Sequence, residues 1–137
     1  YHHFTLGFFI QSVALRKVNG DALPQDMMQS LEKALEFAMI LTRPDGTLPY
    51  MGDIDDARSI YFSDPTNWNF KSYQSIGAAW FDRPDMKYVA GKFGEDAFWL
   101  LTSGDEKRYD ALPARPSEQK TFFLEQTGDR KSTRLNS

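Results

Sequence analysis

The chain has 137 residues, of which 41% are hydrophobic and 15% aromatic, and its formal net charge is -3. This length fits about one domain, and the hydrophobic content indicates a globular chain rather than a disordered one. The absence of cysteine excludes disulfides, thiolate zinc sites and cysteine nucleophiles. The negative charge argues against nucleic-acid binding, and no apolar run approaches the ~20 residues of a membrane span.

The first predicted helix covers residues 4–17. Two basic residues in its last turn suit the helix dipole, and the Asn-Gly-Asp that follows indicates its end. Gly7, inside this helix, costs up to ~1 kcal/mol relative to alanine unless a neighbour packs closely against it. Apolar residues at helical spacing predict the buried stripe, which consists of Leu6, Phe9, Ile10 and Val13.

The second predicted helix runs from residue 24 to residue 42. Its second half is apolar on nearly every side, which is typical of a helix packed by neighbours on both sides. Residues 43–68 then form a long loop rich in proline, glycine and aspartate, and loops of this length are often functional. The stripe of the second helix consists of Met27, Met28, Leu31, Leu35 and Ala38.

Two more helices are predicted, over residues 70–80 and 86–101. Residues 112–119 contain two prolines close together and form a linker, and residues 120–126 favour a β-strand. Four helices paired as hairpins, with a late turn to β structure, predict an all-α domain joined to a β domain. Within the last helix the inward side chains are Phe93, Ala97, Leu100 and Leu101.

Both ends of the chain suggest a piece of a longer protein. Tyr1 opens directly into a helical pattern, without an initiator Met or a signal peptide. Residues 129–137 resemble the translated end of a sequencing adapter, in which case the genuine chain stops near Gly128; the alternative is an ordinary polar tail.

Tyr1, His2 and His3 begin the first helix, where backbone N–H groups and the helix dipole favour anions. A phenol has a reference pKa near ~10, and nearby positive charge would lower it toward useful proton transfer. Adjacent histidines point to different sides of a helix, so we expect no joint metal site here. The alternative is a segment that is disordered or only caps the helix.

The loop sequence RPDGTLPYMGDIDDAR, residues 43–58, allows three interpretations. Its aspartates could bind calcium, although the EF-hand pattern is absent. Asp45 with Asp53 or Asp55 could form the carboxylate pair of a glycosidase. Otherwise the aspartates accept backbone N–H bonds and Arg58 neutralises them.

The aromatic residues form a third candidate set, since aromatic rings stack on sugars as well as filling cores. Trp80 and Trp99 lie in helical patterns, which favours the core for both. The other members of the set are Tyr61, Trp68 and Tyr73.

Three segments together resemble the heparinase II/III-like family of polysaccharide lyases: YHHFTLGFFIQSVAL, PDGTLPYMGDIDDAR, and GEDAFWLLTSGDEKRYDAL leading into SEQKTFFLEQTG. Their order and spacing cover nearly all of residues 1–128. The resemblance implies an incomplete α/α toroid of helical hairpins in residues 1–112. It implies a linker and the first strand of a β-sandwich in residues 113–128.

The resemblance also implies a function, the β-elimination of uronic-acid-containing polysaccharide, with no cofactor and no metal. The substrate carboxylate is neutralised, the C5 proton is abstracted and the O4 leaving group is protonated. Tyr1 looks like the family's catalytic tyrosine, and His2, Arg58 and Asp53 are the substrate-binding candidates. The parent protein is then expected to be bacterial, and periplasmic or secreted, with an acidic polysaccharide as its partner.

Two features of the family pattern are missing from this chain. The neutralising Asn, or Asn-His pair, precedes the tyrosine, and a catalytic His comes from the β domain. We therefore expect the chain to be inactive alone. Two other functions stay open: a non-catalytic carbohydrate-binding or scaffold module of an exopolysaccharide system, and an α/α-barrel glycoside hydrolase.

Overall fold

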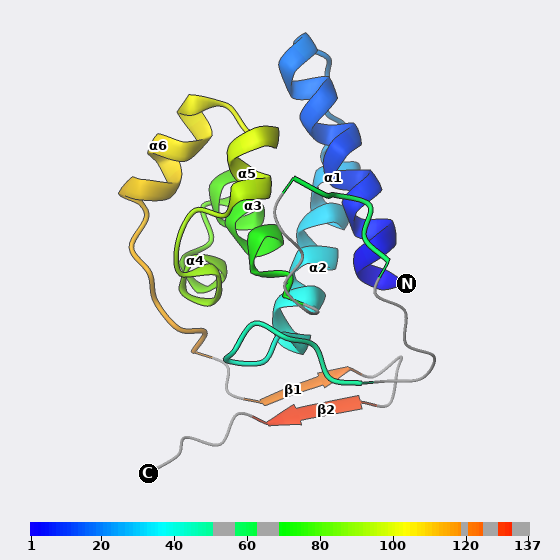
Figure 1. Cartoon of the computed structure of the whole chain (residues 1–137), viewed down its shortest axis with the longest axis vertical. Helices are drawn as coiled ribbons and strands as arrows, with labels where there is room; N and C mark the ends of the chain where they lie inside the picture. The colour runs from blue at the N-terminus through cyan, green and yellow to red at the C-terminus, as the bar shows by residue number, and fades with distance from the viewer. Residues whose placement is uncertain (51–56, 63–68, 119–120, 125–128, 133–137) are drawn as a thin grey trace.

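A computed structural model of the chain (Figure 1) describes residues 1–50, 57–62, 69–118, 121–124 and 129–132. The described residues form an all-α fold with one short β-hairpin near the C-terminal end, which confirms the predicted fold class. The helices are α1 (His2–Asn19), α2 (Gln25–Leu41), α3 (Lys71–Phe81), α4 (Pro84–Ala90), α5 (Glu95–Leu100) and α6 (Ser103–Ala111). The strands are β1 (Thr121–Leu124) and β2 (Asp129–Ser132).

Helices α1 and α2 form an antiparallel hairpin (Figure 1). The turn begins at Gly20, whose φ of 72° is left-handed and suits a residue without a side chain. Both predicted helices are confirmed to within a few residues. Phe9 was wrongly predicted to be buried: its side chain is 53% exposed, because the face that packs against the core is centred on Leu6 and Ile10.

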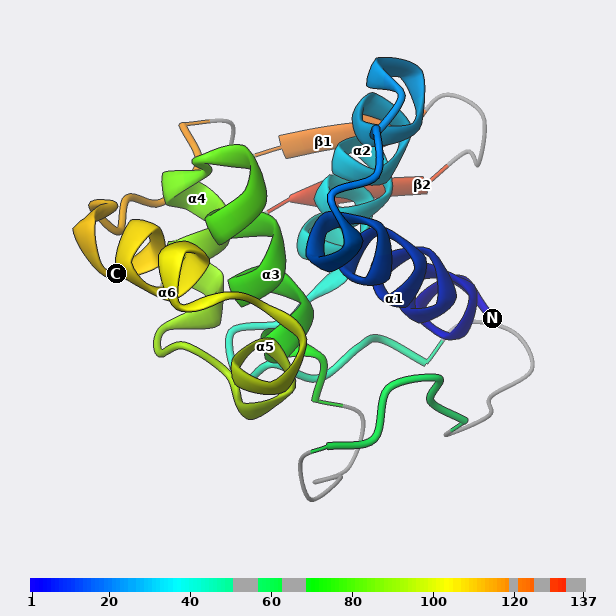
Figure 2. The same cartoon turned by 90° about the horizontal axis from the view of Figure 1, so that it is seen from above.

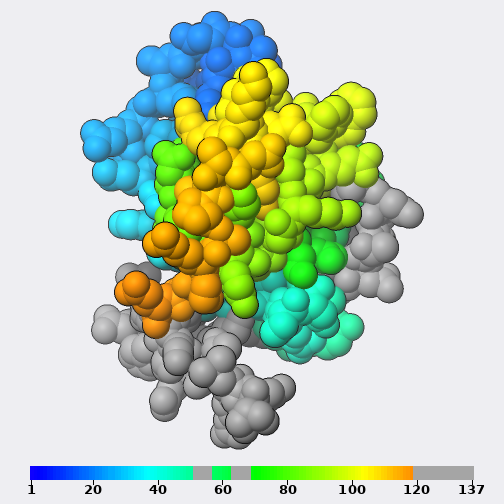
Figure 3. Space-filling view, turned by 90° about the vertical axis from the view of Figure 1, so that its left-hand side faces the viewer, coloured from blue at the N-terminus to red at the C-terminus, as the bar shows by residue number. Residues whose placement is uncertain are grey.

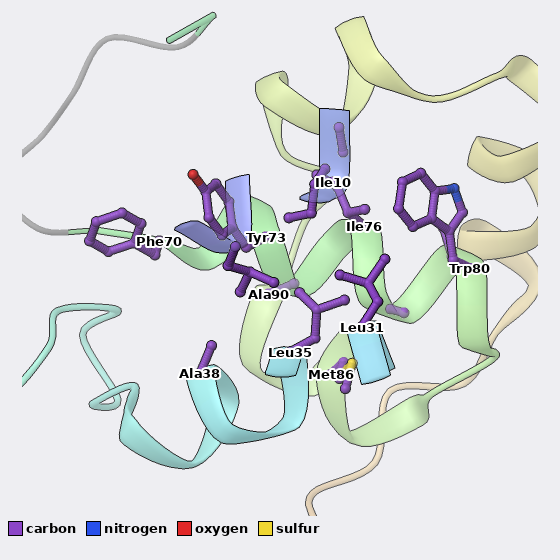
Figure 4. Packing of buried hydrophobic residues seen from close by; sticks show 14 of the residues in the cluster. Ile10, Leu31, Leu35, Ala38, Phe70, Tyr73, Ile76, Trp80, Met86 and Ala90 are labelled. Carbon is purple, nitrogen blue, oxygen red and sulfur yellow. The ribbon is translucent and has the colours of Figure 1, made fainter. Parts of the chain in front are cut away.

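Helix α3 is the centre of the fold, and it packs against α2, α4, α5 and α6. Every residue from Tyr73 to Trp80 is buried, as expected for a helix with neighbours on all sides. Figure 4 shows side chains of the surrounding helices meeting those of α3, among them Ile10, Leu35 and Met86. The second half of α2 is likewise buried, with Leu35 and Ala38 fully enclosed.

The single helix predicted over residues 86–101 was wrong, because two glycines divide it into α4 and α5. Gly91 has a φ of 76° and ends α4, and Gly94 is the N-cap of α5. Pro84 begins α4 at a position where a proline costs no hydrogen bond. Ala97 is fully buried as predicted, and the other three inward residues are partly buried against the core.

Helix α6 was not predicted, because it is strongly polar and carries little apolar periodicity. Its start is fixed by a capping box: the Thr102 hydroxyl accepts from the Asp105 N–H, and the Asp105 carboxylate accepts from the Thr102 N–H. Tyr109 anchors it in the core with 2% exposure. Figure 3 shows the molecular face on which α6 lies and along which the following residues run.

Residues 112–118, after α6, have no regular structure, as their two prolines predicted, and their role as a linker between domains stays a prediction. The Arg115 N–H donates to the Pro84 carbonyl at 3.1 Å and holds this linker beside α4. Strand β1 confirms the predicted β-leaning segment and pairs antiparallel with β2. The tail from residue 129 thus includes a paired strand, while its adapter origin stays a prediction.

None of the helices in the described part of the chain has the length and apolar content needed to cross a bilayer.

Candidate functional site

The start of α1 meets the described end of the long loop, residues 57–62. The Ser59 hydroxyl donates to the Phe4 carbonyl at 2.6 Å, and the Gln11 amide donates to the Ser59 carbonyl at 2.7 Å. Ile60, the next residue, is buried with 1% exposure. The helix start and the described end of the loop, which belong to two separate pieces of the sequence pattern, therefore lie against each other.

Gly7 makes this close contact possible. A Cβ at this position would overlap the Ser59 hydroxyl and would lie 2.6 Å from the Tyr73 hydroxyl. The sequence predicted that a glycine inside this helix implies a closely packed neighbour, and the neighbours are the loop and α3. Gly7 lowers the helix propensity of α1, but it allows the loop and α1 to lie in close contact.

Tyr1 is the N-cap residue of α1 and its side chain is 81% exposed. Its carbonyl accepts the Thr5 N–H at 2.9 Å, so the backbone is fixed by the first helical turn while the phenol faces solvent. The backbone of Tyr1 therefore caps the helix, as one of the two sequence interpretations predicted. The exposed side chain takes no part in the cap and is accessible to a ligand.

His2 lies between α1 and α2. Its Nε2–H donates to the Ala34 carbonyl at 3.0 Å, and its ring contacts Phe37 edge-on, with 4.9 Å between the centroids. Burial lowers the pKa of His2, and the bond to Ala34 opposes this in part. His2 is therefore a neutral, oriented ring that joins the start of α1 to α2.

His3 and Tyr73 form a buried pair behind the surface. Their rings stack with 6.3 Å between centroids, and His3 also packs against Phe70 at 4.5 Å. Burial lowers the pKa of His3 to about 3 and raises the pKa of Tyr73 to about 12, so both are neutral at pH 7. His3 Nε2 and the Tyr73 hydroxyl have no hydrogen-bond partner among the described residues.

Arg58 lies at the same end of α1 as this pair. Its guanidinium donates to the Asn69 carbonyl and stacks over the Phe70 ring, 4.5 Å from the centroid. Its positive charge is close enough to contribute to the lowered pKa of His3. A guanidinium carries five N–H donors, so Arg58 is suited to bind an anion at this end of α1.

Among the loop aspartates, Asp45 behaves as the structural interpretation predicted. Its carboxylate accepts the Thr47 N–H at 2.9 Å and the Thr47 hydroxyl at 2.7 Å, and these bonds lower its pKa. Asp53 and Asp55 lie outside the described residues, so the predicted substrate contact and the carboxylate pair stay predictions. Within the described ranges no group of three or more His, Asp or Glu side chains could hold a metal ion.

The aromatic candidates divide into buried and exposed rings. Trp80 is 8% exposed and Tyr73 fully buried, which confirms the core for Trp80. Trp99 was wrongly predicted to be core: it is 60% exposed, because α5 is a short helix on the rim that buries only its Asp96–Ala97 side. Tyr61 is 63% exposed, and Trp68 lies outside the described residues.

A shallow hollow on α2 is a less suitable candidate. It is lined by Gln29, Glu32, Lys33, Glu36 and Arg83. The Arg83 guanidinium is already engaged by three carboxylates, those of Asp85, Glu32 and Glu36, at 2.7–3.0 Å. These bonds, that to Asp85 foremost, raise the pKa of Arg83. The cluster ties α2 to the start of α4, and it already engages the Arg83 guanidinium in ion pairs within the protein.

Sequence reasoning missed Ser59 and Asp96 as residues that build the site, and it named Tyr73 only as an aromatic candidate. Asp96 is fully buried, and it accepts the Phe62 N–H at 3.1 Å and the Ser72 hydroxyl at 2.6 Å. Each of these residues contacts a partner far away in the sequence, and apolar periodicity, which describes neighbouring residues, does not predict such contacts. Gly7, an unfavourable residue in a helix, was the one local signal of the contact.

A comparison of the chain with protein-family models, curated proteins and solved structures gave no match in any of the three. The all-α fold is shown by the structure itself, and the resemblance to toroid lyases stays a prediction.

Proposed function

We propose that the chain is part of a polysaccharide lyase that cleaves uronic-acid-containing polysaccharide by β-elimination, and that it is inactive alone. One observation carries the proposal. The exposed phenol of Tyr1 and the guanidinium of Arg58, from two separate pieces of the sequence pattern, lie at the same end of α1. An acid/base group beside a cation is the combination that elimination next to a carboxylate requires.

Each residue has a defined role in this reaction. The Tyr1 phenolate takes the proton from C5 of the uronate, the C4–O4 bond breaks as the C4=C5 double bond forms, and the phenol returns the proton to O4. Arg58 binds the substrate carboxylate and stabilises the negative charge that develops on it. His2 holds the start of α1 against α2 and thereby orients Tyr1.

The net charge of the chain favours a localised site over a broad basic surface. With a net charge of -3, the molecule as a whole repels a polyanion. Arg58 is thus a local exception, and its stacking on Phe70 limits its side-chain freedom before substrate binds.

The test uses the full-length protein that contains this chain, incubated with a panel of uronans. The lyase should generate a 4,5-unsaturated uronate, followed by its ultraviolet absorbance. Tyr1→Phe should lower kcat by about 10²-fold or more, because the phenol acts as base and acid. Tyr88→Phe is the matched control, since Tyr88 is an exposed tyrosine on α4 and should leave kcat unchanged.

The outcomes separate the lyase from the two other functions. New reducing ends without ultraviolet absorbance would identify a hydrolase and overturn the proposal. Binding of a uronan without any cleavage would identify a carbohydrate-binding or scaffold module. Full activity of Tyr1→Phe would remove Tyr1 from the mechanism.

A further inference from the structure

We propose that Asn19, at the turn between α1 and α2, is a site of spontaneous deamidation, and that the product weakens the end of α1. Asn19–Gly20 is the one place in the sequence where glycine follows asparagine. Glycine has no side chain of its own to keep the preceding side chain away from its backbone nitrogen. This chemistry is independent of the proposed function, because Asn19 and Tyr1 lie at opposite ends of α1.

The reaction requires water and no other partner. The backbone nitrogen of Gly20 attacks the side-chain carbonyl carbon of Asn19, and a bond forms between them as the bond from that carbon to the amide nitrogen breaks. The amide nitrogen leaves as ammonia and takes the proton that the Gly20 nitrogen has lost. Water then opens the resulting succinimide ring at either of its carbonyls, which yields aspartate or isoaspartate.

The turn leaves this pair of residues open to water. Asn19 is the last residue of α1, and both Asn19 and Gly20 are exposed. Within the described part of the chain no group hydrogen-bonds the Asn19 side chain, and a Cβ at Gly20 would meet no atom within 4 Å beyond its chain neighbours. Figure 1 shows the turn at the top of the molecule, and Figure 2, seen from above, shows it in front of the other elements.

The attacking nitrogen is restrained only by the end of the helix. The Gly20 N–H is shared between the carbonyls of Arg16 and Lys17, and its distance to the Lys17 oxygen is 3.2 Å, at the long end of the usual range. The Asp21 N–H also donates to the Arg16 carbonyl, at 2.9 Å. Because helix ends fray, the last residue leaves its helical geometry at small cost, and the Gly20 nitrogen can then reach the Asn19 side chain.

Asp45–Gly46, the one place where glycine follows aspartate, shows what a protected pair looks like. The Asp45 carboxylate accepts the Thr47 N–H at 2.9 Å and the Thr47 hydroxyl at 2.7 Å, and the Gly46 N–H donates to the Arg43 carbonyl at 2.8 Å. The bonds from Thr47 also lower the pKa of Asp45, and an ionised carboxylate is a poor target for a nitrogen nucleophile. The two pairs therefore differ in how firmly the side chain is held.

The products disturb the end of α1 in two ways. Isoaspartate adds one atom to the main chain between residues 19 and 20, so the bonds that Gly20 and Asp21 donate to the last carbonyls of α1 lose their alignment. Either product also places a negative charge at the C-terminal end of a helix, where the helix dipole disfavours it.

The test follows residue 19 in the whole chain, folded in buffer at pH 6 and pH 8 and unfolded in guanidinium chloride. Peptide mapping by mass spectrometry detects the conversion of an amide to an acid, and labelling by an isoaspartyl methyltransferase detects isoaspartate. Folded Asn19 should react within about tenfold of its rate in the unfolded chain, because a helix end opens at a cost near zero. Folded Asp45 should form isoaspartate at least about tenfold more slowly than unfolded Asp45, since hydrogen bonds to a carboxylate must break first.

Two matched controls accompany this measurement. Asn69 precedes Phe70, and its side-chain oxygen accepts the Lys71 N–H at 3.0 Å, so it should keep its amide. Asn19→Gln keeps an exposed amide, but its ring closure needs a larger ring, so residue 19 should stay unmodified.

The outcomes decide the site and its effect separately. An Asn19 that stays intact in the folded chain while the unfolded chain converts would overturn the site, and so would conversion of Asn19→Gln at the wild-type rate. The modified chain, separated by ion exchange through its additional negative charge, should have a lower urea midpoint than the unmodified chain. Equal midpoints would refute the effect on α1.

Discussion

At Gly7 the backbone of α1 lies against the side chains of Ser59 and Tyr73, and one missing methyl group decides how closely the loop docks. The contact explains a residue that local helix propensity disfavours. The loop that carries Arg58 is placed by this contact, so a residue with no chemistry of its own shapes the candidate site.

Gly7→Ala should therefore destabilise the protein, although alanine is the better helix former. The added Cβ overlaps the Ser59 hydroxyl and crowds Tyr73, and overpacking of this kind costs about 1–3 kcal/mol. The free energy of unfolding in urea measures the change. Gly104→Ala on α6 is the control, since the nearest atom to its Cβ would be 3.6 Å away. Equal stability of the two variants would contradict the close contact.

His3 gives the stability a pH dependence of defined sign. Its pKa is lowered from 6.5 to about 3 by burial, so the unfolded chain takes up a proton below pH 6.5 that the folded chain does not. The stability from neutral His3 is complete above pH 6.5 and is lost as the pH falls toward 3. Between pH 6.5 and 5 this amounts to about 2 kcal/mol.

His3→Phe keeps a ring in the same place and removes the ionisation. The urea midpoint of this variant should change less between pH 7 and 5 than that of wild type, because carboxylates stay largely ionised in that range. If the urea midpoints of the variant and of wild type changed equally between pH 7 and 5, His3 would not be buried in the neutral form.

At the scale of elements, Asp96 is the carboxylate that fastens the loop to the helices. Asp96→Ala leaves the Phe62 N–H and the Ser72 hydroxyl without this acceptor and should cost about 2 kcal/mol or more. Hydrogen exchange at the Phe62 amide should become faster, because the loop end opens locally. Glu95→Ala, an exposed acid on the same helix, should leave that exchange rate unchanged. An unaltered Phe62 rate in Asp96→Ala would refute the anchor.

The helices that the sequence predicted correctly are those with a repeated apolar face, and the errors lie where single residues set the ends of a helix. The periodicity of α1, α2 and α3 predicted these helices because each buries a repeated apolar face. Gly91 and Gly94 broke the predicted fourth helix, since left-handed backbone and an N-cap act more strongly than apolar spacing. Helix α6 could have been found from Thr102 and Asp105, a capping-box signature three residues apart.

At the scale of the whole molecule, the helices form one packed unit and the β-hairpin pairs mainly with itself. Truncation after Glu118 retains the Arg115 contact to α4 and should change the free energy of unfolding by less than about 0.5 kcal/mol. Truncation after Leu101 removes Tyr109 from the core and should abolish cooperative unfolding. Thermal scans of both would test this; a large loss in the first variant would make the hairpin part of the helical core.

The candidate site could be predicted only in part, for a physical reason. Tyr1 and Arg58 were selected from residue types, but the placement of Arg58 at the same end of α1 as Tyr1 depends on tertiary contacts of Ser59, His3 and Asn69. Trp99 was placed in the core because helical spacing does not tell which helix lies at the rim. The sequence therefore indicates which side chains have suitable chemistry, and tertiary packing determines which of them lie close together.

The crowding around Gly7 has a consequence for how this chain can change over generations. Gly7, Ser59 and Tyr73 share one small space, so a larger residue at any of the three is tolerated only if another becomes smaller. In a set of related chains these three positions should vary together, while neighbouring exposed positions such as Phe8 and Phe9 drift independently. Substitutions in the loop at Ser59 are therefore constrained by the residue at position 7.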